Sequence, residues 1–308
     1  MSPLREAMHD YLRVRRRLGF ELKAHGRQLE DFVNFAERAG AQHITTELAL
    51  AWAKLPVDAR PYCWRRRLGT VRAFARYVAT IDPTSEVPAE DLLPATQRRV
   101  APYIYSEAEI EALMTAARAL TPPLCATSFE TLIGLMATTG VRLGEALGLD
   151  RRDVDLDDGV LHVRAAKQQK QREVPLHPTT TEALREYARR RDRLCPTPDT
   201  AAFFLSRRGR RLHKATVHMI FPQLIREVGL EGRGHRARPR PHDLRHAYAV
   251  RTLLGWHGAG EEVERKLPVL ATFLGHADPA SSYWYLQAVP ELLELIGRRL
   301  DGAVGEMP

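Results

Sequence analysis

The segment RPHDLRHAYAV holds two histidines, His242 and His246, that stand four residues apart with Asp243 directly after the first. On a helix this spacing places both imidazoles on one face, where they could share a metal ion. A catalytic zinc ion, however, needs three protein ligands, and the helix of zinc proteases carries Glu rather than Asp after its first histidine. The arginines around the segment would also repel a divalent cation. The sequence therefore favours no metal site, and we expect His246 to point elsewhere on the helix.

The same segment suits a phosphate better. His242 and Arg245 lie three residues apart, so on a helix an imidazole donor and a guanidinium fork can reach one anion together. Similar groups stand in two other segments. In MATTGVRLGEALGLD, Arg142 lies between a glycine-containing helix break and a short helix, and in LATFLGHADPASSYWYLQ, His276 precedes Tyr285 by nine residues. These groups predict an anion site built from distant parts of the chain.

Two lysines, Lys167 and Lys170, lie in the turn of a predicted β-hairpin. The segment GVLHVRAAKQQKQREVPLH, residues 159–177, alternates apolar and polar residues, passes a polar tip and resumes with REVPL. This pattern is typical of two antiparallel strands joined by a loop. A lysine at a hairpin tip is normally only solvated, so its position alone does not indicate a function.

A helix-rich segment opens the chain and offers a further basic surface. Residues 1–80 show helical spacing of apolar residues and almost no strand signal. In PYCWRRRLGTVRAFARYVA, residues 61–79, apolar residues recur at intervals of three and four, so one side of the helix suits a small core. The other faces carry four arginines that would bind phosphates or form a merely solvated basic face: Arg65, Arg66, Arg72 and Arg76.

The helical pattern breaks after residue 80. Four prolines in the next twenty-two residues predict an extended linker rather than a packed element. A new domain then begins with YSEAEIEALM, in which Ser106 and Glu109 make a helix capping box. We therefore predict a helical domain over 1–80, a linker over 81–103 and a second domain over 104–308. In the second domain, further helices are expected at about 179–194, 214–228, 242–256, 261–274 and 290–300.

Charge and composition point to a polyanionic partner. Lys and Arg outnumber Asp and Glu by 46 to 38, for a formal net charge of +8. Residues 207–245 hold eleven Lys or Arg against three acids, including Arg236, Arg238 and Arg240. Such a local excess favours nucleic acid over a merely solvated face.

The composition suggests no membrane anchor, secretory signal or disulfide framework. No apolar run approaches the ~20 residues that span a bilayer, and the first twenty residues are charged throughout. The three cysteines lie 62 and 70 residues apart, so neither disulfides nor a cysteine-based zinc cluster is suggested. We expect a soluble, cytoplasmic protein.

Taken in order, these segments resemble the signature of the tyrosine recombinases, the phage integrase family. Six positions of that signature are filled, at intervals of 25, 75, 3, 31 and 9 residues. They are Arg142 in TTGVRLGEALGL, Lys167 in the hairpin, His242 and Arg245 in HDLRH, His276 in LGH, and Tyr285. The resemblance covers about residues 104–300 and implies a mainly α fold, with a helical N-terminal DNA-clamping domain and a mainly helical catalytic domain that contains a small antiparallel β-sheet. The segments VPLHPTT, PRPHDLRH and YWYL resemble integrases and transposases of bacterial mobile elements more than chromosome-dimer resolvases.

The resemblance also implies a reaction that needs no metal or nucleotide cofactor. Tyr285 would attack a DNA phosphodiester, forming a 3′-phosphotyrosine bond and releasing a 5′-hydroxyl. The other groups would support this step: Arg142 and Arg245 would hold the non-bridging oxygens, Lys167 would protonate the departing oxygen, and His242 and His276 would supply further hydrogen bonds.

Two of these roles have competitors nearby. Lys170 lies close to Lys167, whose usual flanking glycines are replaced by alanine and glutamine, and Tyr283 lies two residues before Tyr285. The spacing of the signature favours Lys167 and Tyr285.

For partners, the resemblance implies double-stranded DNA sites and a tetramer of protomers assembled on two of them. The segment PELLELIGRRL, residues 290–300, would form a helix that packs against a neighbouring protomer or against its own domain. Two other functions stay open. One is a chromosome or plasmid dimer resolvase, or a DNA-relaxing enzyme, of the same chemistry; the other is a non-catalytic DNA-binding protein, against which the complete signature argues.

Overall fold

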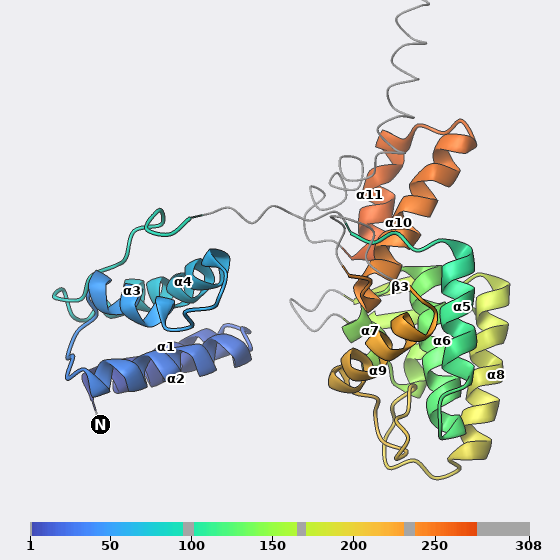
Figure 1. The fold of residues 1–308 in the computed structure, drawn as a ribbon, viewed down its shortest axis with the longest axis horizontal. Helices are drawn as coiled ribbons and strands as arrows, with labels where there is room; N and C mark the ends of the chain where they lie inside the picture. Colours follow the sequence, from blue (N-terminus) through green and yellow to red (C-terminus); the bar gives the residue numbers. More distant parts are fainter. Residues whose placement is uncertain (1, 95–101, 165–170, 231–237, 276–308) are drawn as a thin grey trace, which may run out of the picture. The chain divides into compact units, whose positions relative to one another are not determined.

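The chain forms two compact units, Met1–Arg99 and Val100–Pro308, each with its own hydrophobic core. None of the described helices is long and apolar enough to cross a membrane. The structure is a computed structural model, shown in Figure 1, and it describes residues 2–94, 102–164, 171–230 and 238–275.

Four helices and the segment that follows them make the N-terminal unit. Apolar residues at intervals of three and four give the helices buried faces, which meet around Phe32, Trp52 and Phe74. The rings of Phe32 and Trp52 lie edge-on with centroids 5.4 Å apart, an arrangement that aromatic pairs favour. The helices are α1 (Pro3–Arg17), α2 (Lys23–Arg38), α3 (Thr46–Lys54) and α4 (Pro61–Val78).

The segment after α4 packs against this unit, where a linker was expected from residue 81. Arg72 of α4 is 9% exposed and donates from Nε to the Pro88 carbonyl at 2.7 Å and from Nη2 to the Ala89 carbonyl at 2.6 Å. Leu93 is buried in the N-terminal core. Because this proline-containing segment joins no helix or strand, its carbonyls need other donors, and a buried guanidinium supplies them. The N-terminal unit therefore includes residues up to Leu93.

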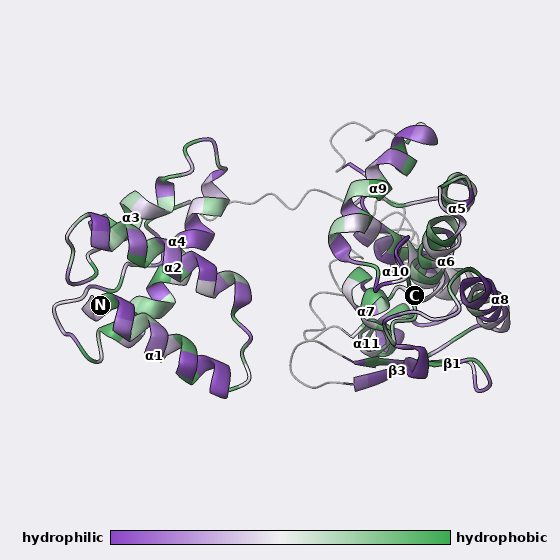
Figure 2. Ribbon diagram, turned by 90° about the horizontal axis from the view of Figure 1, so that it is seen from below, coloured by the Kyte–Doolittle hydropathy of each residue, from purple (hydrophilic) through white to green (hydrophobic). Residues whose placement is uncertain are grey.

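The C-terminal unit is built around one buried helix, α6 (Pro123–Thr139). Twelve of its 17 residues are buried, because PLCATSFETLIGLMATT carries small or apolar side chains on nearly every face. Helices α5, α8 and α10 pack against it. Figure 2 shows that α8, in contrast, is largely hydrophilic on its visible side. The other helices are α5 (Glu107–Arg118), α7 (Leu143–Gly148), α8 (Pro178–Leu194), α9 (Lys214–Glu227), α10 (Pro241–Gly258) and α11 (Val263–Leu274), with a 3-10 turn at Arg151–Asp153.

Helices α8 to α11 confirm four of the helices that the sequence predicts in this unit. Both Pro178 of α8 and Pro241 of α10 stand in the first turn of their helices, where a missing backbone N–H costs nothing. The helix predicted at 290–300 lies outside the described residues.

A small antiparallel sheet packs beside α7. Its strands are β1 (Val154–Asp155), β2 (Val160–Arg164) and β3 (Gln171–Pro175), in the order β1-β2-β3. Leu161 pairs with Val174, and both are buried, whereas the side chains next to them along each strand face outward. The predicted hairpin is therefore confirmed, and so is the mainly α-helical fold with a small antiparallel sheet. The hairpin turn, residues 165–170, lies outside the described residues.

Candidate active site

Gly140 ends α6 and begins the turn that places Arg142. Its φ is +61°, a left-handed conformation that glycine adopts readily. A Cβ atom at this position would lie 2.6 Å from Cδ1 of Tyr248 and 2.8 Å from Cδ2 of Leu274, so a larger residue would force its neighbours to move. The chain then enters α7 with Arg142 as the N-cap residue. This is the junction between a glycine break and a short helix that the sequence predicts.

Arg142 is held on one side and reaches solvent on the other. Its Nη1 donates to Oε1 of Glu145 at 2.7 Å, and its Nη2 donates to the Gly275 carbonyl at 2.6 Å. Its backbone N–H also donates to Oε2 of Glu145 at 2.9 Å. The side chain is still 39% exposed. Because a guanidinium has five N–H donors, Arg142 can bind an anion from the solvent side while it remains held.

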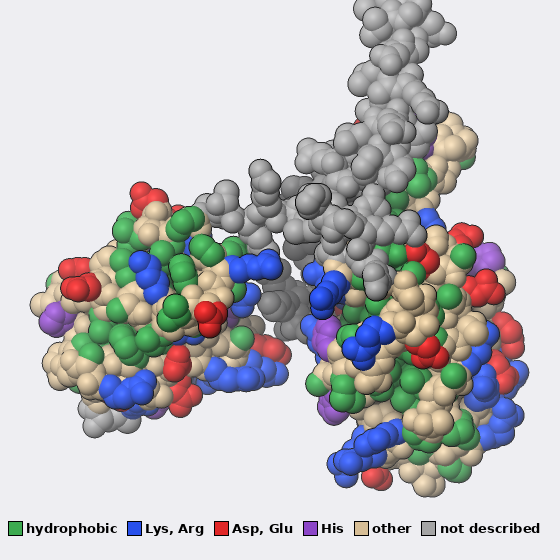
Figure 3. Space-filling model, in the orientation of Figure 1, with side chains coloured by type: hydrophobic (Ala, Val, Ile, Leu, Met, Phe, Trp, Pro, Cys, Tyr) green, Lys and Arg blue, Asp and Glu red, His purple; other side chains and the backbone are tan. Residues whose placement is uncertain are grey.

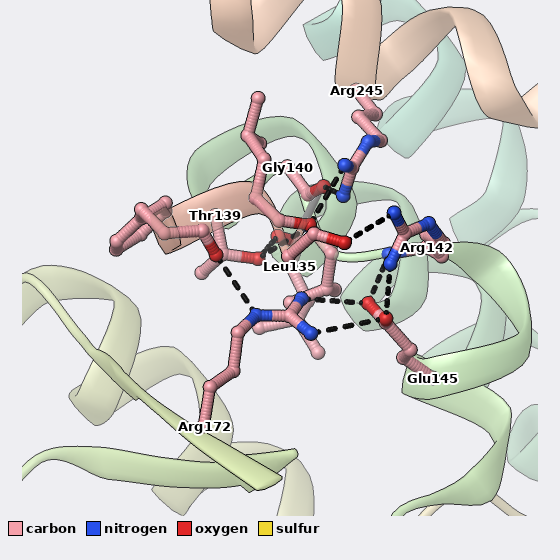
Figure 4. A network of polar contacts seen from close by, with 11 residues as sticks. Leu135, Thr139, Gly140, Arg142, Glu145, Arg172 and Arg245 are labelled. Atoms are coloured by element: carbon pink, nitrogen blue, oxygen red, sulfur yellow. Dashed lines mark hydrogen bonds and ion pairs between the residues drawn. The ribbon is translucent and has the colours of Figure 1, made fainter. Parts of the chain in front are cut away.

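Arg245 is buried between the ends of two helices. Its side chain comes from α10, and the residue is 1% exposed. Its Nη1 donates to the Gly140 carbonyl at the end of α6, and its Nη2 to the Leu274 carbonyl at the end of α11, each at 2.7 Å. Carbonyls at a helix C-terminus lack partners within the helix and carry partial negative charge, so they favour a nearby cation. Figure 4 shows Arg142 and Arg245 approaching this region from different elements.

His242 lies one turn before Arg245 on α10 and contacts His246. The two rings meet edge-on, with centroids 4.8 Å apart and planes at 88°, as their spacing of four residues on one helix allows. His242 is exposed at the surface, but neighbouring protein atoms still remove part of the water around its ring. This desolvation, together with the positive charges of Arg245 and Arg240, lowers the pKa of His242 to about 4. The imidazole is therefore neutral at pH 7.

Asp243, the acid beside His242, belongs to the start of α10 rather than to a metal site. It is fully buried and accepts from the backbone N–H of Arg240 at 2.8 Å and from Nη2 of Arg240 at 3.2 Å. Burial raises the pKa of Asp243, although the hydrogen bond from Arg240 opposes this shift. Within the described residues, no group of three or more His, Cys, Asp and Glu side chains could hold a metal ion.

Two further residues complete this network, and sequence reasoning did not single them out as functional. Arg172 of β3 donates to the Glu145 carboxylate from Nη2 at 2.8 Å and from Nη1 at 3.1 Å. Burial alone would raise the pKa of Glu145, but hydrogen bonds from Arg172 and from the Arg142 backbone outweigh burial and lower the pKa to about 2. The position of Glu145 three residues after Arg142 was an available signal, whereas nothing local marked Arg172.

The described residues contain three of the six signature positions. Arg142, His242 and Arg245 come together from α7 and α10, and Arg240 and Arg142 both lie near enough to His242 to lower its pKa. Lys167, Lys170, Arg236, His276, Tyr283 and Tyr285 lie outside the described residues.

The arginines predicted to bind DNA differ in their surroundings. Arg66, Arg76 and Arg238 are exposed, although Arg76 forms an ion pair with Glu90 at 2.9 Å. Arg65 is half-buried and donates to the Leu93 carbonyl at 3.1 Å. Figure 3 shows Lys and Arg side chains on the visible faces of both units.

Arg72 and Arg240 are also engaged within the protein. Arg72 is buried and bonded to the segment after α4, so its assignment to DNA is corrected: the helical pattern placed it off the apolar face, but the chain folds back over it. Arg240 is paired with Asp243 but keeps a side chain that is 58% exposed, so it can still meet a phosphate.

Comparison with known proteins places the chain among DNA recombinases. A model of the phage integrase family matches residues 104–291. A protein named as an integrase/recombinase, y4rB of Sinorhizobium fredii, is 43% identical over 307 residues, which cover 98% of each chain. The tyrosine recombinase XerC of Alcanivorax borkumensis is 29% identical over 221 residues, which cover 72% of this chain and 67% of the relative.

A solved structure shares the fold. The Tn1549 transposon integrase, in complex with transposon right end DNA, matches with a TM-score of 0.68 at 15% sequence identity, over 98% of this chain and 100% of that one.

Proposed function

Because this chain belongs to the phage integrase family and is a tyrosine-type site-specific DNA recombinase, we propose that it cuts and rejoins DNA through a 3′-phosphotyrosine intermediate. The observation that carries this proposal is the placement of Arg142 and Arg245. Both are fixed by carbonyls at the end of α11, and Arg142 also reaches solvent. A pair of fixed guanidinium groups suits the two non-bridging oxygens of a phosphodiester.

In this proposal the arginines act mainly on the transition state. A phosphoryl group under attack spreads negative charge over its equatorial oxygens, and donors held in place before the reaction stabilise that charge without reorganising. Arginine keeps its charge at any physiological pH. The buried setting of Arg245 strengthens the interaction because water does not screen it.

Tyr285 is the proposed nucleophile. Its oxygen forms a bond to phosphorus as the bond from phosphorus to the 5′-oxygen breaks, and the 5′-oxygen takes a proton from Lys167. The phenol proton needs an acceptor, and the imidazole of His242, one turn before Arg245 on α10, is the proposed group. The new ester keeps the energy of the broken bond, so religation needs no cofactor. His276 supplies a further hydrogen bond to the phosphate.

We assign the protein to a mobile element, where it would integrate, excise or transpose DNA. The integrase/recombinase y4rB matches it over nearly the whole of both chains, and the segments VPLHPTT and PRPHDLRH agree with such enzymes. The second candidate is a dimer resolvase, which the XerC relative supports at lower identity. Both functions require double-stranded DNA sites and, for strand exchange, four protomers, with residues 290–300 as the candidate contact between neighbours.

A nicked suicide substrate tests the chemistry. The DNA would carry the inverted repeats that the purified protein binds. Wild type should form a covalent protein–DNA adduct that survives denaturation, and Tyr285→Phe should form none, whereas Tyr283→Phe should keep it. Equal behaviour of wild type and Tyr285→Phe would exclude the proposed mechanism. Strand exchange between two labelled sites would then separate an integrase from an enzyme that only relaxes DNA.

A further inference from the structure

Three consecutive carbonyls at the end of α11 accept hydrogen bonds from three different arginines, Arg142, Arg172 and Arg245, which Figure 4 labels. The pairs are Phe273 with Arg172 at 2.9 Å, Leu274 with Arg245 at 2.7 Å, and Gly275 with Arg142 at 2.6 Å. Phe273 and Leu274 stand in the last turn of α11 and Gly275 is its C-cap residue, so these carbonyls lack N–H partners within the helix and favour a nearby cation. Arg245 and Arg142 belong to the proposed phosphate site. Arg172 has no part in the proposed chemistry, yet it binds the same helix end.

Arg172 joins three elements of the site. It stands on β3, its Nε donates to the Phe273 carbonyl, and its two Nη atoms grip both oxygens of Glu145. Glu145 in turn holds the side chain and the backbone N–H of Arg142. The side chain of Arg172 is only 12% exposed, so solvent competes little for these bonds.

Gly275 makes room for this guanidinium. Its φ is +67°, and a Cβ atom there would lie 2.6 Å from Nη1 and 2.8 Å from Cζ of Arg172. The Arg172 guanidinium therefore lies directly against the backbone that leads into His276 and against the carboxylate that orients Arg142.

We propose that Arg172 is a positioning residue for strand cleavage. It orients the guanidinium of Arg142 through Glu145 and holds the end of α11 against the hairpin. This role rests on the proposed function. Arg172 follows the hairpin turn that contains Lys167, so one side chain couples the strand after the proposed general acid to the proposed phosphate ligands. A lysine could keep the charge opposite Glu145, but its single Nζ could not reproduce the fork and the Nε bond together.

Arg211 provides a matched control. Its Nη1 donates to the carbonyls of Leu147 at 2.8 Å and Leu149 at 3.2 Å, and its Nη2 pairs with Asp150. It therefore makes the same kinds of bonds as Arg172, to carbonyls and one carboxylate, but at the opposite end of α7 from Arg142. Loss of Arg211 should weaken the fold without moving the phosphate ligands.

The test uses the full chain and a nicked duplex that carries its binding site. Cleavage is measured as a single-turnover rate at saturating DNA, beside the Kd for DNA and the thermal midpoint Tm, for Arg172→Lys, Arg172→Ala and Arg211→Lys. Arg172→Lys should lower Tm about as much as Arg211→Lys and keep Kd near wild type, but it should slow cleavage by on the order of 10-fold, and Arg172→Ala by on the order of 100-fold, because small displacements of catalytic groups are costly. Arg211→Lys should lower Tm while its cleavage rate stays close to wild type.

Two results would overturn the assignment. First, a wild-type cleavage rate in Arg172→Lys would show that the guanidinium fork is not needed for cleavage. Second, if the Arg172 and Arg211 variants lost the same cleavage rate at the same loss of Tm, Arg172 would only stabilise the fold. Failure of wild type itself to form an adduct would instead refute the proposed function, and the role of Arg172 with it.

Discussion

Arg142 and Arg245 donate to adjacent carbonyls of the chain, Arg142 Nη2 to Gly275 at 2.6 Å and Arg245 Nη2 to Leu274 at 2.7 Å. Two guanidinium groups held so near each other repel, and this repulsion disfavours the arrangement unless negative charge offsets it. The partial charge at the C-terminus of α11 offsets part of it, and the Glu145 carboxylate offsets more. The site is therefore arranged for two cations before any phosphate arrives.

The burial of Arg245 leads to a first prediction. Arg245→Lys should keep the positive charge but lose the paired hydrogen bonds to the two carbonyls. The cleavage rate should then fall by on the order of 10²- to 10³-fold, as when a preorganised donor to a transition state is lost. DNA affinity should change little, because many other cations bind the backbone. Single-turnover cleavage and a binding titration measure the two effects separately.

Arg251 is the control for that substitution. It stands on the same helix, and its Nη2 donates to the Ala137 carbonyl of α6 at 2.6 Å. Arg251→Lys should leave the cleavage rate near wild type. A comparable loss of cleavage in both variants would mean that attachment of α10 to α6, rather than the Arg245 fork, governs the rate.

Gly140 supports a second prediction. Gly140→Ala adds a left-handed backbone penalty and a collision with Tyr248, which together should cost about 2–4 kcal/mol of stability. Gly144 is the matched position, because it is exposed in α7 and a Cβ atom added there would meet no described neighbour within 4 Å. Gly144→Ala should be neutral or should stabilise by up to about 1 kcal/mol, since alanine favours helices. Denaturant unfolding of both variants measures the difference, and a neutral Gly140→Ala would contradict it.

Much of the fold was predictable because its determinants are local. The apolar spacing of α4 and the alternation in β2 and β3 decide which face is buried, and the glycine at the end of α6 marks where the helix stops. The packing of residues up to Leu93 on α4 was not predictable from the proline pattern. It depends on Arg72, whose partners lie 16 and 17 residues further along the chain.

The candidate site, like the fold, was predictable only where local sequence determines it. Arg142, His242 and Arg245 carry residue types and spacings that indicate phosphate chemistry, and the structure brings them together. Arg172 carried no such signal, since its bond to Phe273 spans 101 residues of sequence. The edge-on contact between His242 and His246 depends on side-chain rotamers, which helical spacing alone does not decide.

A third prediction concerns pH. The folded chain lowers the pKa of His242 to about 4, below the value of about 6.5 in an unfolded chain. Between these values the unfolded state binds more protons, so this group's contribution to stability is full above about pH 6.5 and is lost as pH falls toward 4. His242→Gln should therefore flatten the change of Tm with pH across this window. An unchanged pH profile in His242→Gln, with the exposed His218→Gln as control, would contradict the assignment.

Burial is the largest cause of the lowered pKa of His242 and the nearby arginines are the next, and a phosphate bound beside those arginines should raise the pKa again by offsetting their charge. Binding should then take up protons below pH 6.5, and affinity for DNA should rise as pH falls through this range. Titration of the His242 ring by NMR in the free chain and in a Tyr285→Phe complex measures both pKa values directly. Equal pKa values in the two states would place the phosphate away from His242.

The fourth prediction separates the arginines of α4. Arg72 is buried and bonded to two carbonyls, so Arg72→Ala should lower the stability of the N-terminal unit by about 1.5–3 kcal/mol. Arg66 is exposed on the same helix, and Arg66→Ala should leave Tm unchanged but weaken DNA binding.

If Arg66 meets one phosphate, the slope of log K against log salt should become shallower by about 1. The slope of Arg72→Ala should match wild type wherever the variant stays folded, because a guanidinium occupied by Pro88 and Ala89 releases no counterion from DNA. A shallower slope of log K against log salt in Arg72→Ala, at a normal Tm, would instead show that Arg72 contacts DNA.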